Sequence, residues 1–529
     1  GSGLTPGEVA TLRQWILNGA HMRPATVRLP ARPDPVDDYT FLRRVFLDTV
    51  GVAPTLDEIR QFQQDDVQQR RDAVIARLLQ DPRWADNWVG YWQDVLAENP
   101  NLLKPTLNNT GPFRFWLHDA LTDNRSVDRI ATELIMMRGS TWGGGAAGFA
   151  VASQNDVPMA AKAHVISSAF LGVNLKCARC HDAPYHHWKQ SDLFQMAAML
   201  ERRSLTLPES STVPAAFFEK QARRSLIDVT LQPGAKIPAE FPFEEFHTDL
   251  PSVPTDTRAQ LAAQVTSSRR FDEVIANRIW KRLMGAGLVE PVDDWENNPP
   301  SDPQLLSFLA DTLISVDYDL RAFAGMILRS RAYQSQAVSR SDAGRNRLPL
   351  QYRRRMSAEQ IVDSALHGVG KRMQTDQLTM DVEGTLPANR FLNFGFPQRA
   401  WELTSLANER DRPSLALPQA QSIVDVLLAF GWRNSRPEPV SEREESPNLL
   451  QPGVLANGSF GLRLTRITDD SQLTQLMLQE QSLPQLIDSL YLRLLTRFPT
   501  RDEQHDFMAL LSPGFEARIV PADKIPPLV

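Results

Sequence analysis

The sequence predicts a mainly α-helical protein with two large helical domains and a small β-containing insert. Three observations lead to this fold class. Apolar residues recur at helical spacing, as at Val9, Leu12 and Ile16. Strong helix-start signatures stand near both ends of the chain. Strand-like alternation is seen in the short stretch 225–231, inside a proline-rich region.

Changes in composition divide the chain into segments. An amphipathic helix is expected over residues 4–22, followed by a linker rich in proline and arginine at 23–36. The predicted organisation is then a first helical domain at 37–203, the β-containing insert or linker at 204–255, and a second helical domain at 256–529 with a polar linker at 434–453.

One helix-start phrase occurs twice. In Pro54-Thr55-Leu56-Asp57-Glu58, Thr55 can cap a helix and Glu58 completes a capping box. The phrase recurs as Pro499-Thr500-Arg501-Asp502-Glu503, and Phe62 and Phe507 stand at matching offsets. Each copy follows a helix of similar pattern. We interpret the two as an internal repeat of a helix-turn-helix unit; two independent capping boxes are the alternative.

Further helices are predicted in the middle of the chain. One is expected at about 158–174, another at 188–203, and a helical pattern runs from about 257 to 335. Trp84, Trp88 and Trp92 recur at intervals of four residues. Such a stripe usually belongs to the core, although it could also line a haem pocket.

The overall composition excludes some classes of function. The 529 residues are 42% hydrophobic and carry a net charge of -6, so no basic excess points to nucleic acid. No apolar run is long enough to span a bilayer. No signal peptide opens the sequence, and Gly1-Ser2 resembles a cloning remnant.

Both cysteines of the chain lie in one run, Cys177-Ala178-Arg179-Cys180-His181. The spacing C-x-x-C-H is typical of c-type haem attachment. In that chemistry Cys177 and Cys180 bind the haem covalently and His181 ligates the iron. Haem attachment of this kind would place the protein outside the cytoplasm.

Three other interpretations of the motif stay open. A thioredoxin-like redox pair expects a βαβ context, whereas the preceding residues predict a helix. A disulfide between the two cysteines would close a very short loop and stabilise little. A zinc site would be completed by His181, His186 or His187.

Several residues are candidates for further roles if haem is bound. A sixth iron ligand would decide between electron transfer and catalysis. The candidates with enough intervening chain are Met159, His164, Met196 and Met199. For each of them, packing or exposure to solvent is the simpler interpretation.

Two groups near or beyond the motif are candidates for other chemistry. The possible acid–base groups are Asp182, Tyr185, His186 and His187. The simpler interpretation is that Asp182 caps a turn and that the histidines are partly exposed. The run Arg353-Arg354-Arg355 is a candidate for binding an anion or a haem propionate, with a solvated helix start as the simpler interpretation.

Many phrases in a fixed order resemble one known family. In the first domain they are Leu42-Arg43-Arg44-Val45-Phe46-Leu47-Asp48, Tyr91-Trp92-Gln93-Asp94 and Cys177-Ala178-Arg179-Cys180-His181-Asp182. In the second they include Asn277-Arg278-Ile279-Trp280, Asp293-Asp294, Asn298-Pro299-Pro300-Ser301 and Arg354-Arg355-Met356-Ser357-Ala358-Glu359-Gln360. The chain resembles planctomycete proteins that pair a cytochrome C domain with two associated domains of unknown function.

The resemblance implies a haem-c-like motif and a periplasmic or secreted location. It also implies that residues 1–23 are the remnant of a separate N-terminal cytochrome-like domain. The sequence departs from the family at Ala183, where relatives commonly carry a second histidine before the proline; His186 and His187 lie nearby.

The predicted function is that of an extracytoplasmic c-type haem redox protein whose large helical domain binds a substrate or a partner. A redox partner protein is expected, and a carbohydrate substrate is possible. One alternative is a secreted haem- or metal-dependent enzyme that acts on carbohydrate. The other is a structural or interaction protein with a Cys177–Cys180 disulfide and no cofactor. The sequence leaves open whether the protein is an enzyme.

Overall fold

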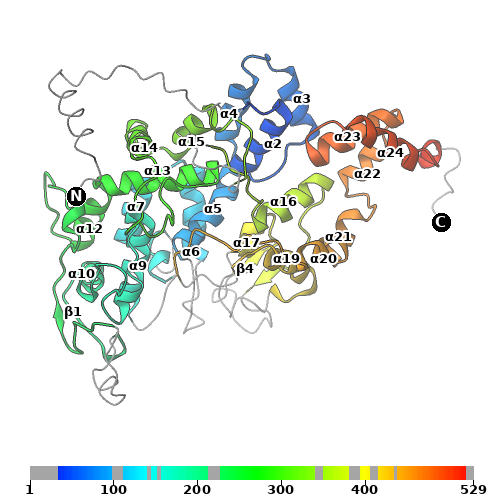
Figure 1. Ribbon diagram of the computed structural model, residues 1–529. Coiled ribbons are helices and arrows are strands. Elements are labelled where there is room, and N and C mark those ends of the chain that lie inside the picture. The colour runs from blue at the N-terminus through cyan, green and yellow to red at the C-terminus, as the bar shows by residue number, and fades with distance from the viewer. Residues whose placement is uncertain are drawn as a thin grey trace, which may run out of the picture.

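The computed structural model confirms a mainly helical chain, elongated in the view of Figure 1. The structure describes residues 34–97, 111–139, 145–151, 157–211, 227–339, 350–379, 393–404, 415–433 and 438–519. The predicted helix at 4–22, the remnant at 1–23 and most of the linker at 23–36 lie outside these residues. Helices α9, α10 and α12 stand at one end of the molecule and α22–α24 at the other.

The first half of the chain is built mainly of helices, with a long connection between α10 and α12. They are α2 (Asp38–Thr49), α3 (Leu56–Gln64), α4 (Arg70–Gln80), α5 (Arg83–Val95), α6 (Gly111–Thr122), α7 (Val127–Met136), α8 (Gly148–Val151), α9 (Pro158–Leu171), α10 (Gln190–Glu201) and α12 (Thr257–Thr266), with 3₁₀ turns at Cys177–Arg179, Glu209–Ser211 and Glu244–Phe246.

The second half continues in the same way. Its helices are α13 (Arg269–Met284), α14 (Pro303–Ser315), α15 (Leu320–Arg329), α16 (Ala358–Val369), α17 (Ala400–Thr404), α19 (Pro418–Ala429), α20 (Leu450–Ala456), α21 (Ser459–Thr465), α22 (Gln472–Leu478), α23 (Leu483–Leu495) and α24 (Arg501–Leu511), with a 3₁₀ turn at Phe515–Arg518.

The described strands form two small antiparallel pairs. β1 (Leu205–Thr206) pairs with β2 (Lys236–Ile237), and β3 (Leu378–Thr379) pairs with β4 (Asn393–Gly395). The first pair lies within the predicted insert. The expected strand at 225–231 is wrong for its described part, because residues 227–231 form no strand and the pairing lies to either side of them. Alternation of apolar residues alone does not supply a neighbouring strand to pair with.

Both predicted capping boxes form. The Thr55 and Thr500 hydroxyls each accept a hydrogen bond 3.2 Å long, from the backbone N–H of Glu58 and of Glu503 respectively. The two helix-turn-helix units also contact each other, because Arg43 of α2 donates to the Leu494 carbonyl oxygen at the end of α23. Their burial differs: Phe62 is 1% exposed, whereas its counterpart Phe507 is 37% exposed.

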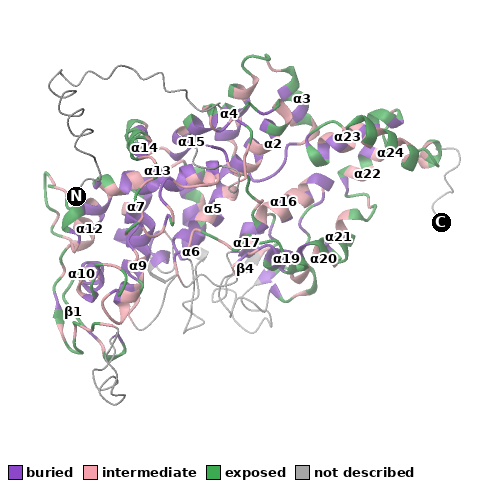
Figure 2. Cartoon of the chain, in the orientation of Figure 1, coloured by how far each residue is buried: buried purple, intermediate pink, exposed green. Residues whose placement is uncertain are grey.

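The buried apolar side chains of the described residues form one large cluster and two smaller ones. The large cluster runs from Val36 to Tyr333 and includes Trp401. It therefore combines residues of both predicted domains, whose boundaries stay predictions. Figure 2 shows many buried residues in helices such as α5, α9 and α13. The tryptophans of the α5 stripe all lie in this core: Trp84, Trp88 and Trp92.

A buried ion cluster joins α5 to the second half of the chain. Arg443 contacts Asp94 of α5 at 2.5 Å and Glu359 of α16 at 2.6 Å. Burial alone would lower the pKa of Arg443, but the attraction of the two carboxylates holds it above its usual range. Arg443 likewise lowers the pKa of Glu359 against the effect of burial.

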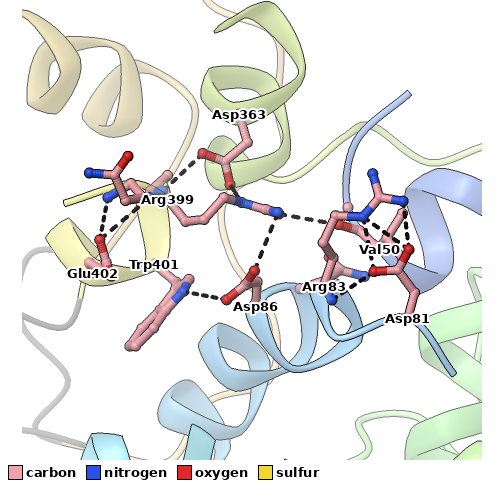
Figure 3. Close-up of polar contacts among 12 residues, drawn as sticks. Val50, Asp81, Arg83, Asp86, Asp363, Arg399, Trp401 and Glu402 are labelled. Atoms are coloured by element: carbon pink, nitrogen blue, oxygen red, sulfur yellow. Dashed lines mark hydrogen bonds and ion pairs between the residues drawn. The ribbon is translucent and has the colours of Figure 1, made fainter. Parts of the chain in front are cut away.

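A second cluster of largely buried charges also involves α16, through Asp363 (Figure 3). Arg399 donates to Asp363 of α16 at 2.8 Å and to the Val50 carbonyl oxygen at 3.2 Å. Asp86 of α5 accepts a hydrogen bond of 3.0 Å from the indole N–H of Trp401. Together the two clusters fix α16 and α17 against α5.

Removing Arg443 tests how much the first cluster contributes. Arg443→Met should lower the free energy of unfolding by about 3–5 kcal/mol, because it removes the cation that faces two largely buried carboxylates. Adding Glu359→Gln should recover part of the loss by removing one of those charges. Urea denaturation of both variants measures the two changes in the free energy of unfolding. The matched control is Arg60→Met in the exposed Arg60–Asp57 pair, expected to cost about 1 kcal/mol or less. Equal losses in Arg443→Met and the control would contradict the prediction.

Candidate functional site around Cys177–His187

The end of α9 positions the C-x-x-C-H motif. The helix stops at Gly172, whose φ of +64° lies in the left-handed region. A Cβ at this position would stand 2.5 Å from Cδ1 of Trp295. Glycine therefore satisfies two constraints there: it permits the turn, and it lets the indole of Trp295 pack on the helix end. The Gly172 carbonyl oxygen also accepts a hydrogen bond of 2.8 Å from the Trp295 backbone N–H.

The motif itself forms a tight turn with two free thiols. Cys177–Arg179 is a single 3₁₀ turn, and the backbone N–H groups of Cys180 and His181 both donate to the Cys177 carbonyl oxygen at 3.2 Å. Neither thiol is in a disulfide, and both are partly exposed. The disulfide alternative is therefore not seen in the structure.

A single hydrogen bond fixes the tautomer of His181. Its Nδ1 lies 2.7 Å from the Asp182 carbonyl oxygen. A carbonyl oxygen only accepts, so Nδ1 carries the proton and the lone pair of the neutral ring is on Nε2. Metal-ligating histidines commonly have this arrangement.

Carboxylates of the second half of the chain hold the two neighbouring histidines. His186 Nε2 lies 2.7 Å from Asp294, and His187 Nδ1 lies 2.7 Å from Glu296. In each carboxylate the second oxygen is buried without a hydrogen-bond partner. The adjacent Asp293 pairs with Arg278 of α13 at 2.8 Å. One loop therefore makes one contact with α13 and two with the histidines that follow the motif.

The other two acid–base candidates have different surroundings. One oxygen of Asp182 accepts hydrogen bonds of 2.9 Å from the Gln190 backbone N–H and from the Thr230 hydroxyl. This capping role agrees with the simpler interpretation of Asp182. Tyr185 is 84% exposed. The structure thus brings His186 and His187, but not Tyr185, into contact with acidic side chains.

The candidates for a sixth ligand lie on the two helices that flank the motif, α9 and α10, which pack against each other. Met159, Met196 and Met199 are buried in the large apolar cluster, so each has a packing role. His164 differs, because burial lowers its pKa to about 4 and its Nδ1 has no hydrogen-bond partner. It is therefore neutral at pH 7 and has an unused nitrogen.

The residues present include the groups that would hold a c-type haem. Two free thiols at the attachment spacing and a histidine with its lone pair on Nε2 are the groups that haem attachment needs. Within the described ranges, by contrast, no three His, Cys, Asp or Glu side chains gather as a metal ion would require. The residues that would hold haem are Cys177, Cys180 and His181.

Comparison with known families shows to which family the chain belongs. Residues 27–204 match a family described as a protein of unknown function (DUF1549), and residues 257–511 match a second one, also described as a protein of unknown function (DUF1553). The chain belongs to the planctomycete cytochrome-C-associated family, which is defined by these paired domains of unknown function. No curated protein and no solved structure matches it. None of the described helices has the length and apolar character needed to cross a membrane.

The family match places the site at the junction of the two matched regions. The first region supplies the C-x-x-C-H motif, and the second supplies Asp293, Asp294 and Glu296. Sequence reasoning noted the pair Asp293-Asp294 as a family phrase but did not place it beside the histidines. The signal was present as acidic residues in a loop, although nothing local in the sequence indicated their partners.

The lowered pKa of the half-buried His164 predicts a specific pH dependence. Its folded pKa lies below the ordinary value of 6.5, so between pH 6.5 and 4 the unfolded chain binds a proton that the folded chain does not. Stability should therefore be lost as the pH falls through this window. His164→Phe should make the free energy of unfolding fall less steeply between pH 6.5 and 4. His505→Gln, at an exposed position on α24, is the control and should leave the slope unchanged. Equal slopes in wild type and His164→Phe would contradict the assignment.

Proposed function

We propose that the protein is an extracytoplasmic, periplasmic or secreted, c-type haem redox protein that exchanges electrons with a partner protein. The observation that carries the proposal is the state of the motif: two free thiols and a His181 ring whose Nδ1–H is held by a backbone carbonyl oxygen. Bound haem would supply one-electron chemistry.

The protein's own residues would then have distinct tasks. Cys177 and Cys180 fix the group covalently, and the Asp182 carbonyl oxygen orients the His181 ring. The partial exposure of both cysteines supports access for a partner protein. The loop carrying Asp294 and Glu296 holds the next turn of the chain in place.

Haem attachment can be tested directly. The protein should be exported from a bacterium that has haem-attachment machinery, with a known c-type cytochrome co-expressed as a positive control. We expect a Soret band and a mass gain of one haem. The double variant Cys177→Ala/Cys180→Ala should lose the mass gain, His181→Ala should change the spectrum, and His505→Ala should change neither.

Three outcomes would contradict haem attachment. A colourless wild-type protein of unchanged mass, alongside a control cytochrome that has acquired haem, would overturn it. A mass lower by two protons would favour the disulfide alternative. Zinc in the purified protein would favour the metal alternative.

We propose a second candidate function, a secreted enzyme that acts on carbohydrate, because His186 is held by a carboxylate. A histidine oriented by Asp294 at 2.7 Å has the arrangement of a general acid or base. In that case His186→Ala should lower kcat by about 10²–10⁴-fold, and Asp294→Asn should also lower it. Release of reducing sugar from a panel of polysaccharides measures this, with His505→Ala as control. Unchanged turnover in His186→Ala would rule out this role for His186.

A further inference from the structure

A large cavity lies away from the C-x-x-C-H motif, between α2, α5, α13, α16 and the segments at 351–357 and 441–445. Its volume is about 920 Å³, at the upper end of the range for small-molecule sites. No residue of 177–187 lines it. Its wall instead contains the other family-like phrases, those around Arg43-Arg44, Tyr91 and Arg354-Arg355.

The wall carries an excess of positive charge although the protein as a whole is acidic. Among the described lining residues, eleven are arginine or lysine and seven are aspartate or glutamate. The paired cations include Arg354 with Asp48, Arg399 with Asp363, and Lys281 with Glu442. The other ion-paired cations of the wall are Arg443, Arg278 with Asp293, and Arg497 with Glu503.

Five arginines of the wall have no carboxylate partner within the described part of the chain: Arg43, Arg44, Arg282, Arg353 and Arg355. Their side chains donate hydrogen bonds to backbone carbonyl oxygens and to one hydroxyl, that of Thr496. Such contacts fix the position of a guanidinium without neutralising its charge. The positive charges of these five arginines are therefore fixed in position but are not neutralised by a carboxylate.

Two of these arginines have buried N–H groups without partners. Arg282 stacks over Trp88 and Tyr91 at 4.5 and 4.8 Å and donates to the Asn87 carbonyl oxygen, which leaves its Nε unpaired. Arg355 donates through Nη2 to the carbonyl oxygens of Phe430 and Glu444, which leaves Nε and Nη1 unpaired. A buried unpaired donor costs about 1–3 kcal/mol, and more when it is charged. Burial lowers the pKa of Arg282 to about 10, so it is still charged at pH 7.

We propose that this cavity binds a small ligand that carries two or more sulfate, phosphate or carboxylate groups. The guanidinium groups of Arg282 and Arg355 would attract its anionic oxygens, and Arg353 at the exposed side would add charge. Guanidinium groups suit this task because their fixed donors match the geometry of such oxygens. Arg353-Arg354-Arg355 is therefore part of an anion site rather than a merely solvated helix start. The proposal does not depend on haem, because the motif contributes nothing to the wall.

Binding of pyrophosphate, measured by titration calorimetry on the full chain, tests the site. We expect saturable binding that weakens as NaCl is raised and that is tighter than binding of the singly charged acetate. Arg353→Gln and Arg355→Gln should each weaken binding about tenfold or more, the effect of losing a hydrogen bond to a charged group. Arg353 is exposed, so its replacement is expected to leave folding intact even if Arg355→Gln impairs it.

Two further variants test whether binding changes in the direction that the charge of the wall predicts. Glu445→Gln removes an exposed acidic group from the same wall and should tighten pyrophosphate binding. Arg60→Gln, at the exposed pair on α3, should change nothing. Wild type that binds no pyrophosphate, or binding that Arg353→Gln leaves intact, would overturn the proposal. Competition by a sulfated disaccharide or by a sugar phosphate then distinguishes the two sources of the anionic groups.

Discussion

The contact of Arg443 with Asp94 and Glu359 is the constraint on which the arrangement of the two matched regions depends. It places three charges in a largely buried position, where each is tolerated only because the others are present. Asp94 belongs to the first region and Glu359 to the second, and Arg443 reaches both from an irregular segment that has no helix of its own. In the neighbouring cluster, Arg399 likewise pairs with a carboxylate of each region, Asp86 of the first and Asp363 of the second. The cavity forms beside these charges, and its wall includes them.

The same dependence on both regions holds at the C-x-x-C-H motif. The loop at 293–296 ties the motif to α13 through carboxylates that contact Arg278, His186 and His187. Trp295 adds an apolar contact against the end of α9, which a side chain at Gly172 would block. The motif is thus part of a rigid junction rather than an isolated loop. A redox group attached there would be held against the second region as well as the first.

The sequence was most informative where the cause of structure is local. The capping boxes at Thr55 and Thr500, the helices that flank Cys177 and the buried stripe of α5 depend on residues a few positions apart, and these predictions are confirmed. The strand expected at 225–231 is absent from its described part, residues 227–231, because pairing needs a second segment. Asp294, the partner of His186, lies 108 residues away in the chain and Phe430, a partner of Arg355, lies 75 residues away, so no local pattern identified them. Cofactor, partner and reaction stay predictions for the same reason: they depend on what the folded surface meets.

The large apolar cluster that combines residues from Val36 to Tyr333 has a consequence for the history of the chain. Cutting the polypeptide between the two matched regions would expose apolar surface to solvent on both pieces. Each piece would also lose ion-pair partners of its buried charges. During synthesis, the first 200 residues have to wait for α13–α15 before their core can close. Recombination that separates the two regions would therefore destabilise both of them. This is a physical reason for the two regions to be inherited as one unit.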